Sequence, residues 1–178
     1  MNYIDTYAPH IDAIASLFET TFTASEGREE GALIGALARR LMTDTPPSDL
    51  RVVTAWDGGA LVGAILFTRL IFEDPRPAFL LAPVAVAPDR QGEGIGQALI
   101  THGLGLLRED GVEIAVTYGD PAFYGRVGFT QVTEATVPAP HRLQFPEGWL
   151  GQSLSTAALA PLNGPAICVS GFNDPRLW

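Results

Sequence analysis

Lysine is absent from this 178-residue sequence, and all eleven basic residues are arginines. Mechanisms that depend on a lysine amine are therefore excluded, namely the Schiff-base lysine, the pyridoxal-phosphate lysine and the P-loop lysine. Asp and Glu together number twenty, so the formal net charge is −9. Nucleic-acid-binding proteins need a basic stripe to neutralise phosphates, so we expect no nucleic acid as a partner.

Cysteine, histidine and long apolar runs are also scarce. The single cysteine, Cys168, excludes an internal disulfide and a thiolate metal cage; it suits a reducing compartment, so we expect a cytoplasmic protein. The three histidines show no ligand spacing, so we expect no metal. Apolar stretches fall far below the roughly 18 residues of a membrane span, and the first residues do not resemble a signal peptide, so we expect no membrane contact.

Composition and hydrophobic patterning predict a mixed α/β fold. Apolar residues make up 47% of the chain, enough for one sizeable core, so we expect a single domain over residues 1–178. The core of this domain, which carries the sequence motifs described below residue by residue, is expected at about 50–134. A less regular extension is expected at about 138–178. Apolar residues spaced three and four apart predict amphipathic helices at 9–22 and 26–42. The apolar face of the second helix is expected to consist of Leu33, Ile34, Leu37 and Leu41.

After residue 50 the pattern changes to that of strands separated by short helices. Strands are expected at 51–56, 60–72, 79–87, 112–117, 129–132, 149–154 and 166–169, and helices at 94–110 and 120–126. We therefore expect an α/β (mixed α+β) domain with a central mixed, twisted sheet and helices on both faces. Pro83 lies inside the third strand, where it predicts a bulge or a local break in pairing; a plain edge irregularity is the alternative.

The most informative segment is a glycine turn at residues 89–96, between the strand expected at 79–87 and the helix that follows it. Glycines let backbone approach a ligand closely, and the free N–H groups of a helix start favour an anion such as a phosphate. The dinucleotide fingerprint G-x-G-x-x-G fails here, because its last glycine would fall on Gln97 or Leu99. The P-loop pattern fails because there is no lysine.

The turn does contain Gln-x-x-Gly-x-Gly, at Gln91, Gly94 and Gly96. A second match follows about 30 residues later, where Phe123 and Tyr124 open a Phe-Tyr-x-x-x-Gly-Phe segment. In both motifs the chain resembles the Gcn5-related N-acetyltransferase (GNAT) superfamily. The Gly-Asp-Pro at residues 119–121 is similar to one bacterial branch of predicted N-acetyltransferases.

The resemblance implies acetyl-CoA as cosubstrate, wedged between two parallel strands that splay apart, here 79–87 and 112–117. Backbone amides of the glycine turn would hold the pyrophosphate, and the edge of the preceding strand would pair with the pantetheine like an added strand. The cofactor-binding residues implied in this way are Val84, Ala85, Val86, Gln91, Gly92, Glu93, Gly94, Ile95, Gly96, Gln97 and Phe123.

The resemblance also implies direct attack of an amine on the thioester, with Tyr124 as the acid that protonates the departing thiolate. The alternative for Tyr124 is an aromatic residue that only packs its helix on the sheet. The general base stays open. The candidates are three carboxylates near the site, Glu73, Asp74 and Glu113. The alternative for each is a charge that is only solvated, and a chain of water molecules is a further alternative for the base.

Several residues depart from the family pattern or stay ambiguous. Glu93 stands where the family often has Lys or Arg; it would repel a phosphate unless it points into solvent, the orientation we expect. The family's frequent Asn before the tyrosine is replaced by Gly119 and the two residues after it. Tyr118 either lines the site or packs, and His102 is expected at the boundary of its helix face.

Taken together, these features predict transfer of an acetyl group from acetyl-CoA to a primary amine of a small molecule or a peptide N-terminus, in a ternary complex. The alternative is a non-catalytic acyl-CoA-binding or sensing module on the same fold. A structural domain with a decayed loop is a weaker alternative, because the glycines are intact. The acidic balance favours a cationic acceptor. The sequence leaves the oligomeric state open, with a homodimer as the commonest type of assembly.

Overall fold

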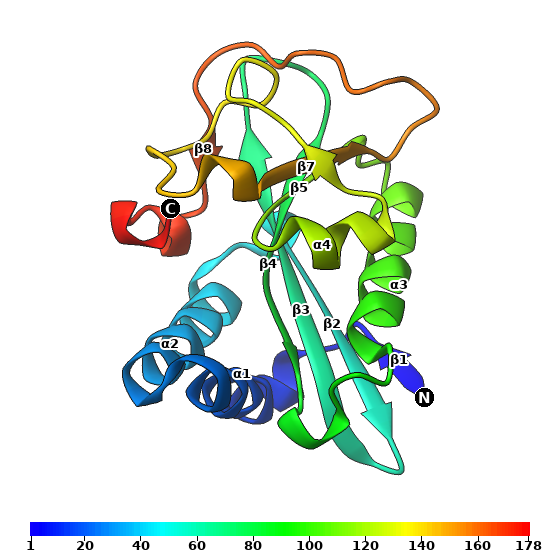
Figure 1. The fold of residues 1–178 in the computed structure, drawn as a ribbon. Helices are drawn as coiled ribbons and strands as arrows, with labels where there is room; N and C mark the ends of the chain where they lie inside the picture. Colours follow the sequence, from blue (N-terminus) through cyan, green and yellow to red (C-terminus); the bar gives the residue numbers. More distant parts are fainter. The chain divides into compact units, whose positions relative to one another are not determined.

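The computed structural model describes all residues from 1 to 178 and contains four α-helices and eight strands (Figure 1). In chain order they are β1 Asn2–Ile4, α1 Ile11–Glu26, α2 Arg28–Asp44, β2 Leu50–Asp57, β3 Ala60–Ile71, β4 Ala78–Val86, α3 Ile95–Glu109, β5 Ile114–Tyr118, α4 Pro121–Tyr124, β6 Thr130–Gln131, β7 Trp149–Ser153 and β8 Ile167–Cys168. The strands hydrogen-bond in the order β1-β2-β3-β4-β5-β7-β6, and β8 pairs with β3. The sheet is mostly antiparallel and contains one parallel pair, β4–β5. A mixed sheet together with α-helices confirms the predicted mixed α/β fold.

The chain divides into two compact units. The first unit comprises residues 1–67 and 83–103, and the second comprises residues 68–82 and 104–178.

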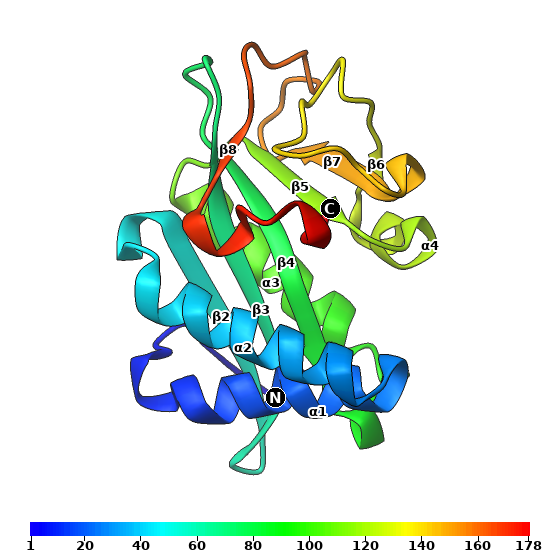
Figure 2. The same ribbon diagram turned by 90° about the vertical axis from the view of Figure 1, so that its left-hand side faces the viewer.

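In the first unit, helices cover both faces of the β2–β3 hairpin. Figure 2 shows α1 and α2 in front of these strands and α3 behind them. Close packing is possible because small residues lie at the contacts. A Cβ added to Gly35 would meet the Cβ of Glu19 at 2.8 Å, and one added to Gly103 would meet the Phe67 ring at 2.6 Å. These glycines therefore bring α2 against α1, and α3 against β3.

Two sequence-based expectations for the first unit were wrong. Leu33 is 46% exposed, whereas Ile34 and Leu41 on the same helix are buried, so the buried stripe of α2 runs one residue further round than expected. Strand β1 was not expected at all. It pairs antiparallel with β2, with Tyr3 opposite Ala55, and three residues are too few to show an alternating pattern.

In the second unit, β5 lies between a parallel and an antiparallel neighbour. It pairs with β4 on one edge and with β7 on the other, and β7 pairs in turn with β6. Trp149 of β7 is fully buried, and its indole N–H donates to the carbonyl of Val137 at 2.8 Å. The residues after 138 thus contribute two strands and a large core side chain to this unit.

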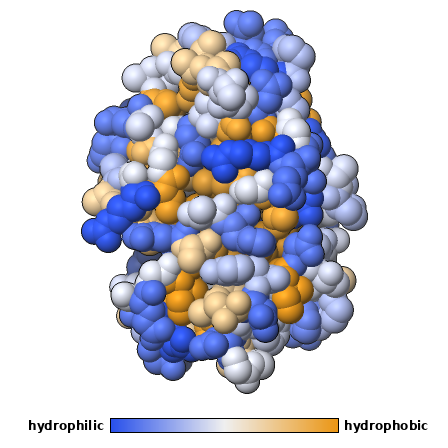
Figure 3. All heavy atoms as spheres, turned by 90° about the vertical axis from the view of Figure 1, so that its right-hand side faces the viewer, coloured by the Kyte–Doolittle hydropathy of each residue, from blue (hydrophilic) through white to orange (hydrophobic).

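Neither a membrane-spanning helix nor a metal-binding cluster of side chains is found in the structure. On the face in Figure 3, hydrophobic residues reach the surface at several separate places among hydrophilic ones. None of the helices combines the length and the apolarity needed to cross a bilayer. No group of three His, Cys, Asp or Glu side chains is arranged to hold a metal ion.

Candidate functional site

The glycine turn of the first unit links the end of β4 to the start of α3. A short 3-10 turn over Pro88–Arg90 is followed by two glycines with left-handed backbone, Gly92 at φ 82° and Gly94 at φ 80°. The Gly94 carbonyl accepts the N–H of Ala98 at 3.0 Å and so opens α3. Such a helix start presents N–H groups without partners in the helix, a geometry that binds anions.

Open space surrounds both left-handed glycines. A Cβ added to Gly92 or to Gly94 would meet no atom within 4 Å. Backbone conformation, and not crowding inside the protein, is therefore what requires glycine at these positions. The free space leaves the backbone of the turn approachable from outside.

The start of the turn is anchored through the carbonyl of Val86. This carbonyl accepts a hydrogen bond from the Gln91 side-chain amide at 3.2 Å and another from the Thr21 hydroxyl of α1 at 3.3 Å. The next residue, Ala87, donates its N–H to Val62 of β3 at 3.0 Å. Gln91 of the predicted motif thus holds the turn to its own strand, and sequence reasoning did not single out Thr21.

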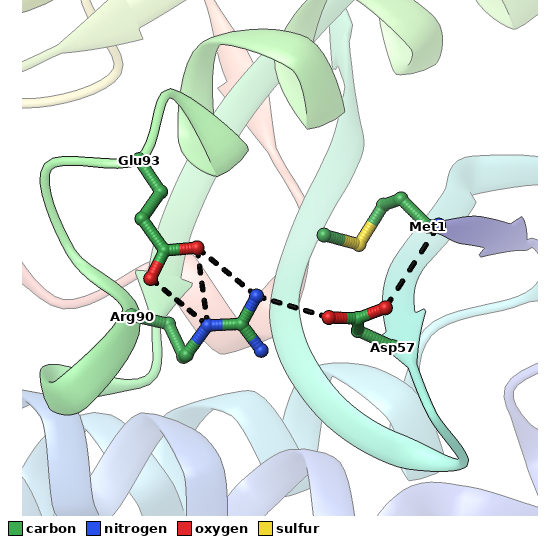
Figure 4. A network of polar contacts seen from close by, with 4 residues as sticks. All are labelled: Met1, Asp57, Arg90 and Glu93. Atoms are coloured by element: carbon green, nitrogen blue, oxygen red, sulfur yellow. Dashed lines mark hydrogen bonds and ion pairs between the residues drawn. The ribbon is translucent and has the colours of Figure 1, made fainter.

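Glu93 is held by an arginine. Arg90 Nε donates to both carboxylate oxygens of Glu93, at 3.0 and 3.1 Å, and Arg90 Nη2 reaches Asp57 at 3.0 Å (Figure 4). The amino group of Met1 lies 4.0 Å from the same Asp57. The hydrogen bonds that Arg90 donates to Glu93 and, second, to Asp57 raise the pKa of Arg90, so this cation is firmly charged. Glu93 is about half exposed, as expected for a side chain pointing to solvent, but its charge is paired.

The parallel strand pair of the second unit ends before β4 does. Its register runs from Ala78 opposite Ile114 to Leu81 opposite Thr117, while β4 continues to Val86. At the last pair, the buried Thr117 hydroxyl donates to the Leu81 carbonyl at 2.9 Å. The register therefore stops two residues before Pro83, which agrees with the predicted break in pairing.

Tyr124 lies at the end of the short helix α4. Asp120 caps this helix by accepting the Ala122 N–H at 2.9 Å. The Tyr124 ring meets Phe123 and Phe129 edge-on, with centroids 5.0 and 5.8 Å away. Burial raises the pKa of the Tyr124 phenol, the neighbouring Thr117 hydroxyl lowers it, and the Asp120 carboxylate raises it. The net result is a raised pKa, so the phenol stays protonated at neutral pH.

Tyr118, at the end of β5, is engaged in an aromatic cluster. Its hydroxyl accepts the backbone N–H of Phe145 at 2.7 Å, and its ring stacks on Trp178 with the centroids 6.4 Å apart. Trp149 meets the same ring edge-on at 6.3 Å. Of the two sequence-based alternatives for Tyr118, packing is the one that these contacts favour.

The carboxylates considered as general bases differ in their surroundings. Asp74 is bound by Arg76, which donates to both of its oxygens at 2.6–2.8 Å. This pairing lowers the pKa of Asp74 from 3.8 to about 2, so Asp74 is a poor proton acceptor.

His102, expected at a helix boundary, is exposed and stacks on Tyr3 with ring centroids 4.7 Å apart.

The predicted site residues fall into both units. Val84–Val86 and Gln91–Gln97 belong to the first unit, where the contacts at Val86 bring the strand end and the turn together. Phe123 and Tyr124 belong to the second unit and contact each other. Sequence reasoning missed Thr21 and Thr117, because neither carries a local signal, and it gave Arg90 no role although Arg90 opens the glycine segment.

Comparisons with known proteins agree with both motifs. A family model described as "Acetyltransferase (GNAT) domain" matches residues 4–132. The uncharacterized N-acetyltransferase YjhQ of Escherichia coli (strain K12) is 36% identical over 125 residues, a match that covers 67% of this chain and 68% of that protein. The uncharacterized N-acetyltransferase YhbS of the same strain is 35% identical over 81 residues, 45% of this chain and 48% of that protein.

Solved structures share the fold. The chain matches the crystal structure of YhbS from Escherichia coli in complex with CoA with a TM-score of 0.81 at 24% identity, covering 97% of this chain and 92% of that one. It matches a GNAT family acetyltransferase from Brucella melitensis in complex with acetyl-CoA with a TM-score of 0.70 at 25% identity, covering 97% of both chains. With the family model spanning most of its length and a relative above one-third identity, this chain belongs to the GNAT acetyltransferase family.

Proposed function

We propose that this protein transfers an acetyl group from acetyl-CoA to a primary amine. The observation that carries the proposal is the turn at the start of α3, with two left-handed glycines and open space around them. Its position after a strand that outlasts its parallel partner is the arrangement expected for a CoA site. Solved relatives that hold CoA or acetyl-CoA support the assignment.

The cosubstrate would be held largely by backbone. N–H groups of residues 91–97 would bind the pyrophosphate, with no lysine to assist and with Arg90 already paired to Glu93. Pantetheine would pair with the edge of Val84–Val86. Because the Val86 carbonyl already accepts two hydrogen bonds, its lone pairs are used, so Val84 is the better partner for the pantetheine amides.

The transfer itself needs no enzyme nucleophile. The amine nitrogen attacks the thioester carbonyl, the C–S bond breaks, and the thiolate leaves with its electron pair while the nitrogen loses a proton. Tyr124 would donate its phenolic proton to the thiolate, since its raised pKa keeps that proton in place at pH 7. Glu73 and Glu113 remain candidates for receiving the amine proton, whereas the lowered pKa of Asp74 counts against it.

The acceptor is proposed to be a cationic small-molecule amine or a peptide N-terminus. The net charge of −9 would attract such a substrate. Structures of the same fold include an aminoglycoside 6'-N-acetyltransferase, and a relative 34% identical over 120 residues is a mycothiol acetyltransferase. Both units would act together as one acetyltransferase domain, expected in a reducing compartment such as the cytoplasm.

Two measurements test this proposal. Acetyl-CoA should raise the melting temperature, and a panel of amines should release free thiol from acetyl-CoA with at least one of its members. Replacing Tyr124 with Phe removes only the hydroxyl, so turnover should fall roughly 10–100-fold while acetyl-CoA affinity changes little. Cofactor binding without thiol release from any amine would support the alternative, a non-catalytic acyl-CoA-binding module. Full turnover in a folded Tyr124→Phe variant would remove Tyr124 from the reaction.

A further inference from the structure

We propose that Gly119 is a positioning residue, whose missing side chain lets the Tyr124 ring seat against the end of β5 and so fixes the phenolic oxygen. This inference rests on the proposed acid role of Tyr124 and adds a second residue to it. Gly119 is the first of the three residues, 119–121, that stand where the family frequently has an Asn before the tyrosine.

The contact between Gly119 and Tyr124 leaves no room for a side chain. A Cβ added to Gly119 would lie 2.7 Å from Cε2 of Tyr124, 3.5 Å from Cδ2 and 3.7 Å from Cζ, whereas ordinary contacts begin at 3.4 Å. Gly119 does not have a positive φ, so its backbone conformation is open to any residue. Glycine is therefore required here by the nearness of the tyrosine ring and not by the turn.

The backbone of Gly119 is also confined by Gly148. Its N–H donates to the carbonyl of Gly148 at 2.9 Å, and a Cβ added to Gly148 would lie 3.0 Å from the Gly119 carbonyl. Retreat of residue 119 away from the ring would therefore disturb this second backbone contact. An alanine at 119 is expected to move the Tyr124 ring instead.

The main chain of Tyr124 is held as well, so displacement falls on its side chain. Its N–H donates to the carbonyl of Asp120 at 3.1 Å, and its carbonyl accepts the N–H of Phe129 at 3.3 Å. Phe123 and Phe129 flank the ring edge-on. These two rings limit rotation of the Tyr124 ring about its own axis, so the displacement falls on rotation about the Cα–Cβ bond, which carries the hydroxyl, the outermost atom, furthest. A misplacement of about 1 Å at a reacting group is enough for a large loss of rate.

The direct test is Gly119→Ala beside Gly125→Ala, each also made in a Tyr124→Phe background. Gly125 lies next to Tyr124, at φ −59° with nothing within 4 Å of an added Cβ, so it is a matched control. With acetyl-CoA and an amine found to be a substrate, Gly119→Ala should lower kcat about threefold or more, up to the loss caused by Tyr124→Phe. KM for acetyl-CoA should stay within about twofold, and Gly125→Ala should keep full kcat.

The double variant separates positioning from general stability. In the Tyr124→Phe background the Gly119→Ala change should leave kcat unaltered, because no hydroxyl remains to be misplaced. An equal loss of kcat in both backgrounds would overturn the inference, as would full kcat in Gly119→Ala alone. Full kcat in Tyr124→Phe would refute the acid role itself, a distinct result from either of these.

A spectroscopic measurement applies without any acceptor. Ultraviolet titration, taken as the difference from Tyr124→Phe, reports the phenol pKa of Tyr124. Because burial raises this pKa, displacement of the ring in Gly119→Ala should lower it toward its ordinary value, and an unchanged value would overturn the inference. If Gly119→Ala does not fold, Gly148→Ala contacts the same backbone less closely, and a smaller lowering of the Tyr124 pKa is expected.

Discussion

Replacing Gly94 with alanine tests whether the glycine turn binds the cosubstrate. Gly94 has φ 80°, a conformation that costs an L-residue about 1–2 kcal/mol. A melting temperature lower by about 2–4 °C for each kcal/mol is therefore expected for a chain of this size. The added methyl group meets nothing in the free protein, so no further loss of stability is expected.

In the complex the same methyl group would stand where backbone must meet the pyrophosphate. We expect acetyl-CoA affinity to fall at least tenfold, about 1.4 kcal/mol, when measured by isothermal titration calorimetry. Gly111→Ala is the matched control, because Gly111 has the same φ of 80° and equally open surroundings after the other end of α3. It should lose the same stability and keep full affinity.

Equal affinity losses in both variants would show that the effect comes from backbone strain and not from the ligand contact. Unchanged affinity in a folded Gly94→Ala variant would refute the assignment of this turn to the pyrophosphate. Either result would leave the family membership intact and remove the proposed binding site.

The Glu93–Arg90 pair, the Asp74 carboxylate and the Asp120 cap give three further predictions. Glu93→Gln should tighten acetyl-CoA binding by no more than about threefold at ~0.1 M salt, since exposed charges are screened; calorimetry showing tenfold or more would mean that Glu93 faces the phosphates. Because the pKa of Asp74 is lowered to about 2, its stabilising pairing with Arg76 is complete above pH ~4 and lost as the pH falls toward 2. The stability gap between the natural protein and Asp74→Asn, measured by urea unfolding, should therefore shrink over that range, and a constant gap would contradict the pairing. Asp120→Ala removes the cap of α4 and should lower the free energy of unfolding by about 1 kcal/mol; no change would show that the cap is dispensable.

Local sequence patterns determined most elements of this protein. Helix α2 follows from apolar spacing, and the glycine turn follows from its motif, because both depend on residues close together in the chain. The same local logic failed for β1, whose three residues become a strand only through pairing with β2. It also misplaced Leu33, since the edge of a helix face depends on what packs against it.

Tertiary structure alone decided which side chains from distant segments meet at the candidate site. Arg90 meets Glu93 within one turn, but its second partner, Asp57, comes from the β2–β3 hairpin 33 residues away. The need for glycine at 119 is visible only once the Tyr124 ring lies against it and Gly148 contacts its backbone. Periodicity and motifs report the backbone state of a segment and its family. Which side chains meet is set by the packing of distant segments, and no local pattern encodes that packing.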